Sequence, residues 1–171
     1  MKIGQSIINE LIKEKDVISV SIVGSYTENK SIEEIGDLDV VVICNKLSKK
    51  IFSNILKRVK NKKNKQKIII NSTFGPMKIN SNKSLPIHLM IYDTKSHIDH
   101  VLKSPFTCYD WERSKIFRGK PLKEIFSVKR LQLNDFSDSR RTSIDYLNDI
   151  KKGKISIRKY YFKNNKVYLK K

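Results

Sequence analysis

Cysteine is nearly absent from this sequence of 171 residues, which holds only Cys44 and Cys108. Two cysteines so far apart exclude a disulfide-rich fold and a zinc knuckle, which need several closely spaced cysteines. Long hydrophobic runs are also absent, since no apolar stretch approaches the roughly 20 residues that cross a bilayer. No secretory hydrophobic segment follows Met1. We therefore expect a cytoplasmic protein without a membrane partner, whose two cysteines are ordinary thiols.

Acidic residues are missing from two segments, which together carry most of the formal net charge of +19. Lys57–Lys67 contains seven basic residues and Lys151–Lys171 contains nine, with no acid in either. Outside them, the other 20 basic and 17 acidic residues leave a net charge of only +3. Such patches are typical of contacts with RNA or DNA phosphates, which salt weakens. The alternative is compositional drift, because Lys, Asn and Ile are frequent throughout the chain.

Hydrophobic spacing predicts alternating helices and strands over the first 93 residues. Apolar residues at helical spacing predict helices over 3–15 and 48–60. A Ser-x-x-Glu capping box at Ser31 predicts a further short helix. Apolar runs bounded by turn residues predict strands over 17–23, 38–43, 67–72 and 85–92, with a short edge strand over 74–79.

The sequence after Asp93 predicts a different organisation. Helices are expected over 97–102, 110–118 and 138–152, and Gly153 is the expected residue after the last of them. The final twenty residues hold two short aromatic and apolar runs around Asn164-Asn165, which predicts a small hairpin. We expect three parts: a core over 1–93, a helical extension over 94–153, and a basic tail or hairpin over 154–171.

The most informative motif joins a Gly24-Ser25 turn to two carboxylates, Asp37 and Asp39, eleven residues later. Strand side chains alternate, so Asp37 and Asp39 point to the same face. Two carboxylates this close repel each other unless a cation lies between them, and oxygen ligands suit Mg²⁺. Gly24 lets the backbone approach a phosphate, and Ser25 and neighbouring N–H groups can donate to phosphate oxygens. The motif predicts a site for Mg²⁺ and a phosphate group.

In these residues the chain resembles the nucleotidyltransferase superfamily, which includes DNA polymerase β, CCA-adding enzymes and aminoglycoside nucleotidyltransferases. That family has a Gly-Ser turn, a spacer of about this length and an Asp-x-Asp on the next strand, and the resemblance covers about residues 15–93. It implies an α+β fold, a mixed sheet with helices on one face, followed here by a small helical C-terminal part. It further implies that Asp37 and Asp39 bind the metal and that Gly24 and Ser25 hold the triphosphate of an NTP.

A third carboxylate, which active members of the family carry on a later strand, is missing here. His88 takes the matching position, and Asp93 lies on the opposite face of the same strand by alternation. The sequence leaves three roles open for His88: a metal ligand, a base near neutral pH, or a hydrogen-bonded structural residue. Other sources of the missing ligand are Glu28, Glu33 and Glu34.

These observations favour a Mg²⁺-dependent nucleotidyltransferase that transfers NMP from an NTP to a hydroxyl acceptor, with Asp37, Asp39 and His88 as its catalytic residues. The alternative is a catalytically weakened module of the same fold that binds nucleotide or RNA, or an antitoxin-type partner protein. Antitoxin members of the superfamily work beside a helical protein, so the resemblance also implies such a partner. The aromatic residues Phe106, Tyr109 and Trp111 are expected in the core rather than at a base-stacking site.

Overall fold

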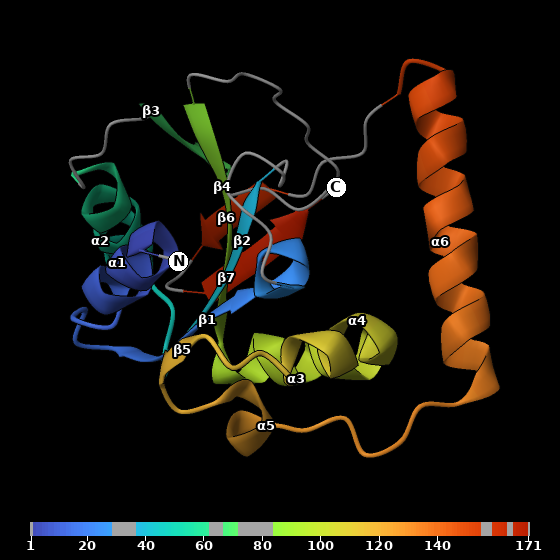
Figure 1. Ribbon diagram of the computed structural model, residues 1–171, viewed down its shortest axis with the longest axis horizontal. Coiled ribbons are helices and arrows are strands. Elements are labelled where there is room, and N and C mark those ends of the chain that lie inside the picture. Colours follow the sequence, from blue (N-terminus) through green and yellow to red (C-terminus); the bar gives the residue numbers. More distant parts are fainter. Residues whose placement is uncertain are drawn as a thin grey trace.

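The computed structural model describes residues 2–28, 37–61, 67–71, 84–154, 159–163 and 166–170. Its centre is a five-stranded mixed sheet with the strand order β3-β4-β2-β1-β5 (Figure 1). β4 pairs in parallel with β3 and β2, whereas β1 is antiparallel to β2 and β5. The strands are β1 (Val17–Val23), β2 (Leu38–Cys44), β3 (Lys67–Asn71), β4 (Ser84–Asp93) and β5 (Phe117–Gly119).

The central strands are buried on both faces, as their continuous apolar runs require. Alternation divides their side chains between two hydrophobic clusters. The first cluster contains Val40, Val42, Leu89 and Ile91, and the second contains Val41, Ile43, Met90 and Tyr92. Each face therefore needs its own layer of helices.

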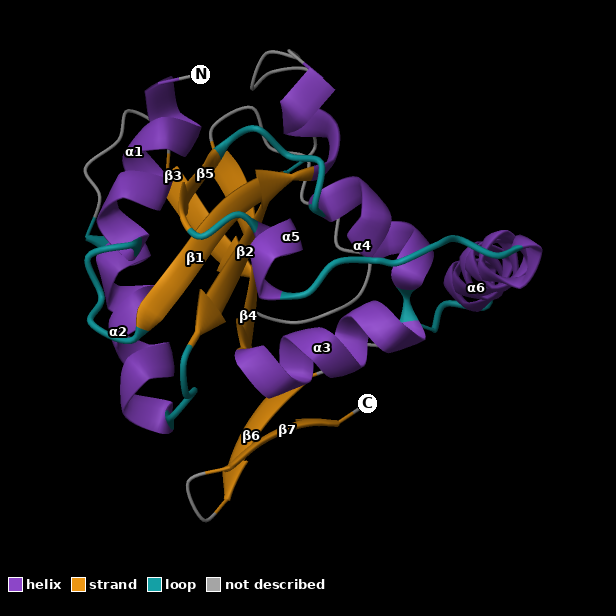
Figure 2. Cartoon of the chain, turned by 90° about the horizontal axis from the view of Figure 1, so that it is seen from below, coloured by secondary structure: helices purple, strands orange, loops and turns teal. Residues whose placement is uncertain are grey.

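Helices α1 (Lys2–Leu11) and α2 (Lys49–Lys60) cover the first face (Figure 2). Ser48 begins α2, since its side chain accepts a hydrogen bond from the backbone N–H of Ile51 at 3.3 Å. Arg58 of α2 joins the two helices by donating to Glu10 at 3.2 Å and Glu14 at 2.9 Å. The two described helices of the predicted core therefore lie on one face, as the resemblance implied.

The second face is covered by α3 (Thr94–Lys103), α4 (Pro105–Trp111) and α5 (Leu122–Ile125) (Figure 2). Asp93 caps α3, because its carboxylate accepts from the Ser96 N–H at 2.8 Å and from the Ser96 hydroxyl at 2.6 Å. Burial raises the pKa of both free thiols, Cys44 and Cys108, to about 12. Both cysteines are therefore unreactive core residues.

The C-terminal part consists of a long helix, α6 (Leu133–Lys151), and a hairpin of β6 (Lys159–Lys163) and β7 (Lys166–Lys170). α6 stands at the edge of the molecule, apart from the sheet (Figure 1). None of the residues of α6 is buried. Among the described residues, no helix is long and apolar enough to cross a membrane. Gly153 follows α6 with a φ of 68°, as expected for the residue after a helix.

The hairpin packs on the same layer as α2. The rings of Tyr160 and Phe162 lie 4.8 Å and 5.2 Å from that of Phe52. The Tyr160 hydroxyl accepts from the N–H of Ile91 at 2.7 Å and donates to its carbonyl at 2.9 Å. β3 pairs with β4 only as far as His88, so Tyr160 satisfies strand backbone that β3 does not reach. The hairpin is thus part of the core structure.

One expected helix, over 110–118, is wrong. α4 begins earlier, with Pro105 in its first turn, and ends at Trp111. Residues 117–119 instead form β5, because the edge of β1 offers unpaired backbone groups and Ile22 N–H donates to the Ile116 carbonyl at 2.9 Å. The other expected strands and helices that the structure describes lie within about five residues of their expected bounds, and α5 was not expected. The short helix at Ser31 and the edge strand over 74–79 lie outside the described residues.

Replacing Tyr160 by Phe is expected to destabilise the fold by about 1–3 kcal/mol, because the backbone groups of Ile91 lose a buried partner. Urea unfolding measures the change. Tyr161→Phe is the matched control on the exposed side of the hairpin, with an expected change within about 0.5 kcal/mol. Equal effects from both variants would contradict the role given to Tyr160.

Candidate active site

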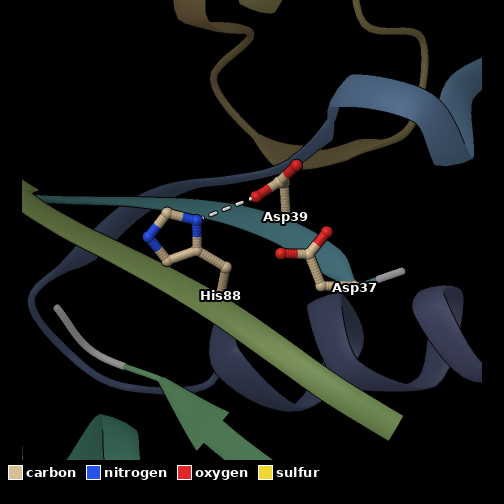
Figure 3. A group of neighbouring side chains, drawn as sticks. All are labelled: Asp37, Asp39 and His88. Carbon is tan, nitrogen blue, oxygen red and sulfur yellow. Dashed lines mark hydrogen bonds and ion pairs between the residues drawn. The ribbon is translucent and has the colours of Figure 1, made fainter. Parts of the chain in front are cut away.

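Asp37, Asp39 and His88 form one cluster at the beginning of β2 (Figure 3). One ligand atom from each residue lies within 4.8 Å of the others. Asp39 is the register partner of His88 in the parallel pairing of β2 with β4. Residues in register on parallel strands point to the same face, so this pairing brings the two side chains together.

The cluster lies on the second face of the sheet, not on the face that α1 and α2 cover. Every second side chain of a strand points to the same face, so Asp39 shares its face with Val41 and Ile43, and His88 shares its face with Met90 and Tyr92. These four apolar residues belong to the second hydrophobic cluster. The side chains of Asp39 and His88 remain 26% and 16% exposed. The site therefore lies where the buried part of this face ends, which keeps it open to a ligand.

Asp39 is held on one side by His88. The Nδ1 atom of His88 lies 3.0 Å from Oδ1 of Asp39 (Figure 3). An ionised carboxylate can only accept, so His88 donates this hydrogen bond through Nδ1–H. The contact fixes the orientation of the Asp39 carboxylate.

Asp39 meets Gly24 on its other side. Gly24 follows β1 at the start of a short 3₁₀ helix, η1 (Gly24–Glu28), with a φ of 72°. A Cβ atom at this position would lie 2.7 Å from Oδ2 of Asp39, closer than real Cβ contacts allow. The glycine is therefore needed both for its conformation and for the close approach.

The turn itself is stabilised by Thr27, whose hydroxyl donates to the Gly24 carbonyl at 2.7 Å. Sequence analysis did not single out this residue, although a hydroxyl three residues after a turn glycine is a common means of closing a turn. Ser25, expected to contact phosphate, follows Gly24 in the same turn and is partly buried. The structure thus brings Gly24 of this turn to Asp39.

Other candidate residues lie elsewhere. Asp93 caps α3, and burial of His97 in the second cluster lowers its pKa to about 4. Trp111 is in the core as expected, whereas Phe106 and Tyr109 are partly exposed, and the Phe106 ring packs against Phe136 of α6 at 5.0 Å. Of the alternative acids, Glu33 and Glu34 lie outside the described residues, as does the side chain of Glu28.

Comparison with known families gives one match. The family model of the nucleotidyltransferase domain matches residues 5–123, more than half of the chain. The matched region contains every member of the cluster and extends through β5 to the start of α5. No curated protein matches the chain, and no solved structure does.

Replacing Gly24 by Ala is expected to weaken divalent-cation binding at least tenfold, because the new Cβ displaces the Asp39 carboxylate. It should also destabilise the fold by about 1–2 kcal/mol, since φ is positive. Gly153→Ala is a matched control, with a φ of 68° and no atom within 4 Å of the added Cβ. Unfolding and Mn²⁺ titration of both variants test this, and unchanged Mn²⁺ affinity in Gly24→Ala would contradict it.

Proposed function

Because the chain belongs to the nucleotidyltransferase family, we propose that it transfers NMP from an NTP to a hydroxyl acceptor with the help of Mg²⁺. The observation that carries this proposal is the meeting of Asp37 and Asp39 with the Gly24-Ser25 turn. A pair of carboxylates and a phosphate-binding turn are the two parts that a metal–triphosphate complex requires.

The donor atoms fit Mg²⁺. Asp37 and Asp39 offer carboxylate oxygens, the ligands that this hard ion prefers, and they lie close enough to share one ion. When bound, Mg²⁺ would neutralise charge on the triphosphate and on the leaving pyrophosphate. An imidazole nitrogen is a less suitable ligand for Mg²⁺, which leaves His88 a different task.

The proposed reaction is a substitution at the α-phosphorus. The acceptor oxygen forms a bond to this atom, the bond to the bridging oxygen breaks, and pyrophosphate leaves with the electron pair. The acceptor proton passes to solvent. Gly24 and Ser25 would hold the triphosphate so that the leaving group lies opposite the acceptor, which is a catalytic contribution by orientation.

A binding module is the alternative function, and His88 is the observation that favours it. A carboxylate at this position would add a metal ligand, whereas His88 donates a hydrogen bond to Asp39. Such a site could bind a metal–nucleotide complex or RNA and transfer little nucleotide. In that case the chain could act as an antitoxin-type partner protein. Release of pyrophosphate distinguishes the two functions.

We also propose RNA or DNA as partners of the two basic segments. The exposed Lys151, Lys152 and Lys154 follow one another at the end of α6 and beyond it. In the first segment Arg58 is engaged by Glu10 and Glu14, and much of Lys57–Lys67 lies outside the described residues. Nucleic-acid contact would therefore depend more on the second segment, Lys151–Lys171.

We propose the same three segments, 1–93, 94–153 and 154–171, as parts of one packed unit, because β5 of the second segment joins the central sheet and the hairpin of the third packs on α2 and β4. The core supplies every residue of the cluster. The extension covers the second face of the sheet, beside the cluster of Asp37, Asp39 and His88. A cytoplasmic location is proposed as well, since both cysteines are free.

A helical protein partner is proposed for α6. Five large apolar side chains of this helix are 46–86% exposed: Leu133, Phe136, Ile144, Leu147 and Ile150. They recur at helical spacing along a stripe about 28 Å long, the length of a 19-residue helix. The acidic residues of α6 lie on the opposite side by the same spacing, so they do not oppose an apolar contact.

A second copy of α6 is the simplest such partner. In an antiparallel pair Leu133 would lie opposite Ile150, and Phe136 opposite Leu147. α6 holds four acidic and three basic residues, so it is nearly neutral in a chain of net charge +19. By the same spacing Arg140 and Lys151 fall within the stripe, so salt that screens these cations should favour the pairing of two copies.

Loss of either carboxylate is expected to abolish pyrophosphate release. Asp37→Ala and Asp39→Ala remove a metal ligand, and the rate should fall roughly a hundredfold or more. The measurement uses each NTP with Mg²⁺, labelled at the α-phosphate, so that the label also identifies an RNA or protein acceptor. Asp99→Ala, an exposed acid on α3, is the control. If an NTP with Mg²⁺ stabilises the native protein against thermal unfolding but no pyrophosphate is released, the binding module is favoured instead.

Charged substitutions in the apolar stripe of α6 should weaken self-association roughly tenfold or more. Leu147→Glu and Ile150→Glu are the test variants, and Asn148→Glu between them on the helix is the matched control. Sedimentation over a wide range of protein concentration measures the change. A monomeric native chain at every concentration would exclude a second copy as the partner of α6.

A further inference from the structure

We infer that His88 takes the place of a metal ion in this site, so that the site holds one divalent cation per chain rather than two. The inference rests on the proposed function in taking Asp37 and Asp39 as metal ligands and the Gly24-Ser25 turn as the triphosphate site. Its basis is the hydrogen bond that holds one oxygen of Asp39 and the position of the other oxygen beside Gly24.

The first contact concerns Oδ1 of Asp39. Nδ1 of His88 lies 3.0 Å away, a normal length for a hydrogen bond from N–H to a carboxylate oxygen. Both side chains are partly buried, which strengthens such a bond relative to one in water. A cation on this side of Asp39 would meet the Nδ1–H donor and would have to displace it.

The second contact concerns Oδ2. This oxygen faces Gly24, where only the absence of a Cβ atom makes room for it. The oxygen that remains available to a cation therefore lies on the side of the turn proposed to hold the triphosphate. The single ion that this site would hold is therefore the one that arrives bound to the triphosphate of the NTP.

Two-metal sites hold their ions about 4 Å apart, and each ion needs its own set of oxygen ligands. Among the described residues, the metal-binding candidates are Asp37, Asp39 and His88. With Oδ1 of Asp39 engaged by His88, the carboxylate oxygens left suffice to anchor one ion but not a second. His88 is thus a positioning residue, which acts on the metal through Asp39.

The geometry of the ring agrees with this role. Figure 3 shows the hydrogen-bonded nitrogen of His88 facing Asp39, while the other ring nitrogen points away from both carboxylates. A ring placed in this way orients the Asp39 carboxylate, which binds the metal, and does not bind the metal itself.

The test counts bound Mn²⁺ by electron paramagnetic resonance in the full-length chain with a non-hydrolysable NTP analogue. The native chain should bind one ion, and His88→Asp, which supplies a carboxylate at the same register position, should bind two. His88→Ala should still bind one ion, about 10- to 100-fold more weakly. His88→Asn should restore much of that loss, because its side-chain amide can donate where Nδ1–H does.

Pulsed resonance on protein with ¹⁵N-labelled histidine adds a second readout, and no nitrogen coupling to the bound Mn²⁺ is expected. Two ions in the native chain, or a nitrogen coupling lost in His88→Ala, would overturn the inference and leave the proposed function standing. Equal affinities for the native chain, His88→Ala and His88→Asn would overturn it too. No bound Mn²⁺ in the native chain would overturn both. Thermal unfolding of each variant excludes misfolding as a cause.

Discussion

The parallel pairing of β2 with β4 is the constraint on which the rest of this structure depends. It places Leu38 beside Ile87 and continues residue by residue to Cys44 beside Asp93. Within that ladder Asp39 falls opposite His88, and both side chains point to the second face. A slip of one residue would turn one partner to the other face and separate them. The chemistry of the site therefore depends on strand register before it depends on any side chain.

That register is secured by burial on both faces. Because both faces of β2 and β4 are buried along the middle of these strands, a slip of one residue would exchange the side chains of the two hydrophobic clusters. The same alternation explains why β4 supplies His88 to the site and Asp93 to the cap of α3, since five positions separate them. The Asp93 carboxylate therefore cannot bind a metal held by Asp37 and Asp39, although it is only five residues from His88 in the sequence.

The sequence was sufficient to predict strands β1 to β4, the C-terminal hairpin and the Asp37-x-Asp39 motif, because apolar runs and alternation are local properties. Three features were beyond it for physical reasons. β5 has a single apolar side chain, and it forms because the edge of β1 needs backbone partners. The contact of Tyr160 with Ile91 joins residues 69 positions apart. The role of His88 stayed open because it depends on a hydrogen bond to a residue on another strand, which no local pattern encodes.

The contact of Tyr160 also changes the meaning of the basic C-terminal segment. A tail attached only by a linker would carry its charge independently of the core. Here Tyr160 binds the backbone of Ile91, three residues beyond His88 on the same strand, and burial raises its pKa so that the hydroxyl remains protonated. The backbone of the hairpin is therefore joined to the sheet that carries the site, beside the partly buried ring of Tyr160. This basic segment therefore cannot be treated as a tail that is independent of the core, because its hairpin packs on the first face of the sheet while Asp37 and Asp39 lie on the second.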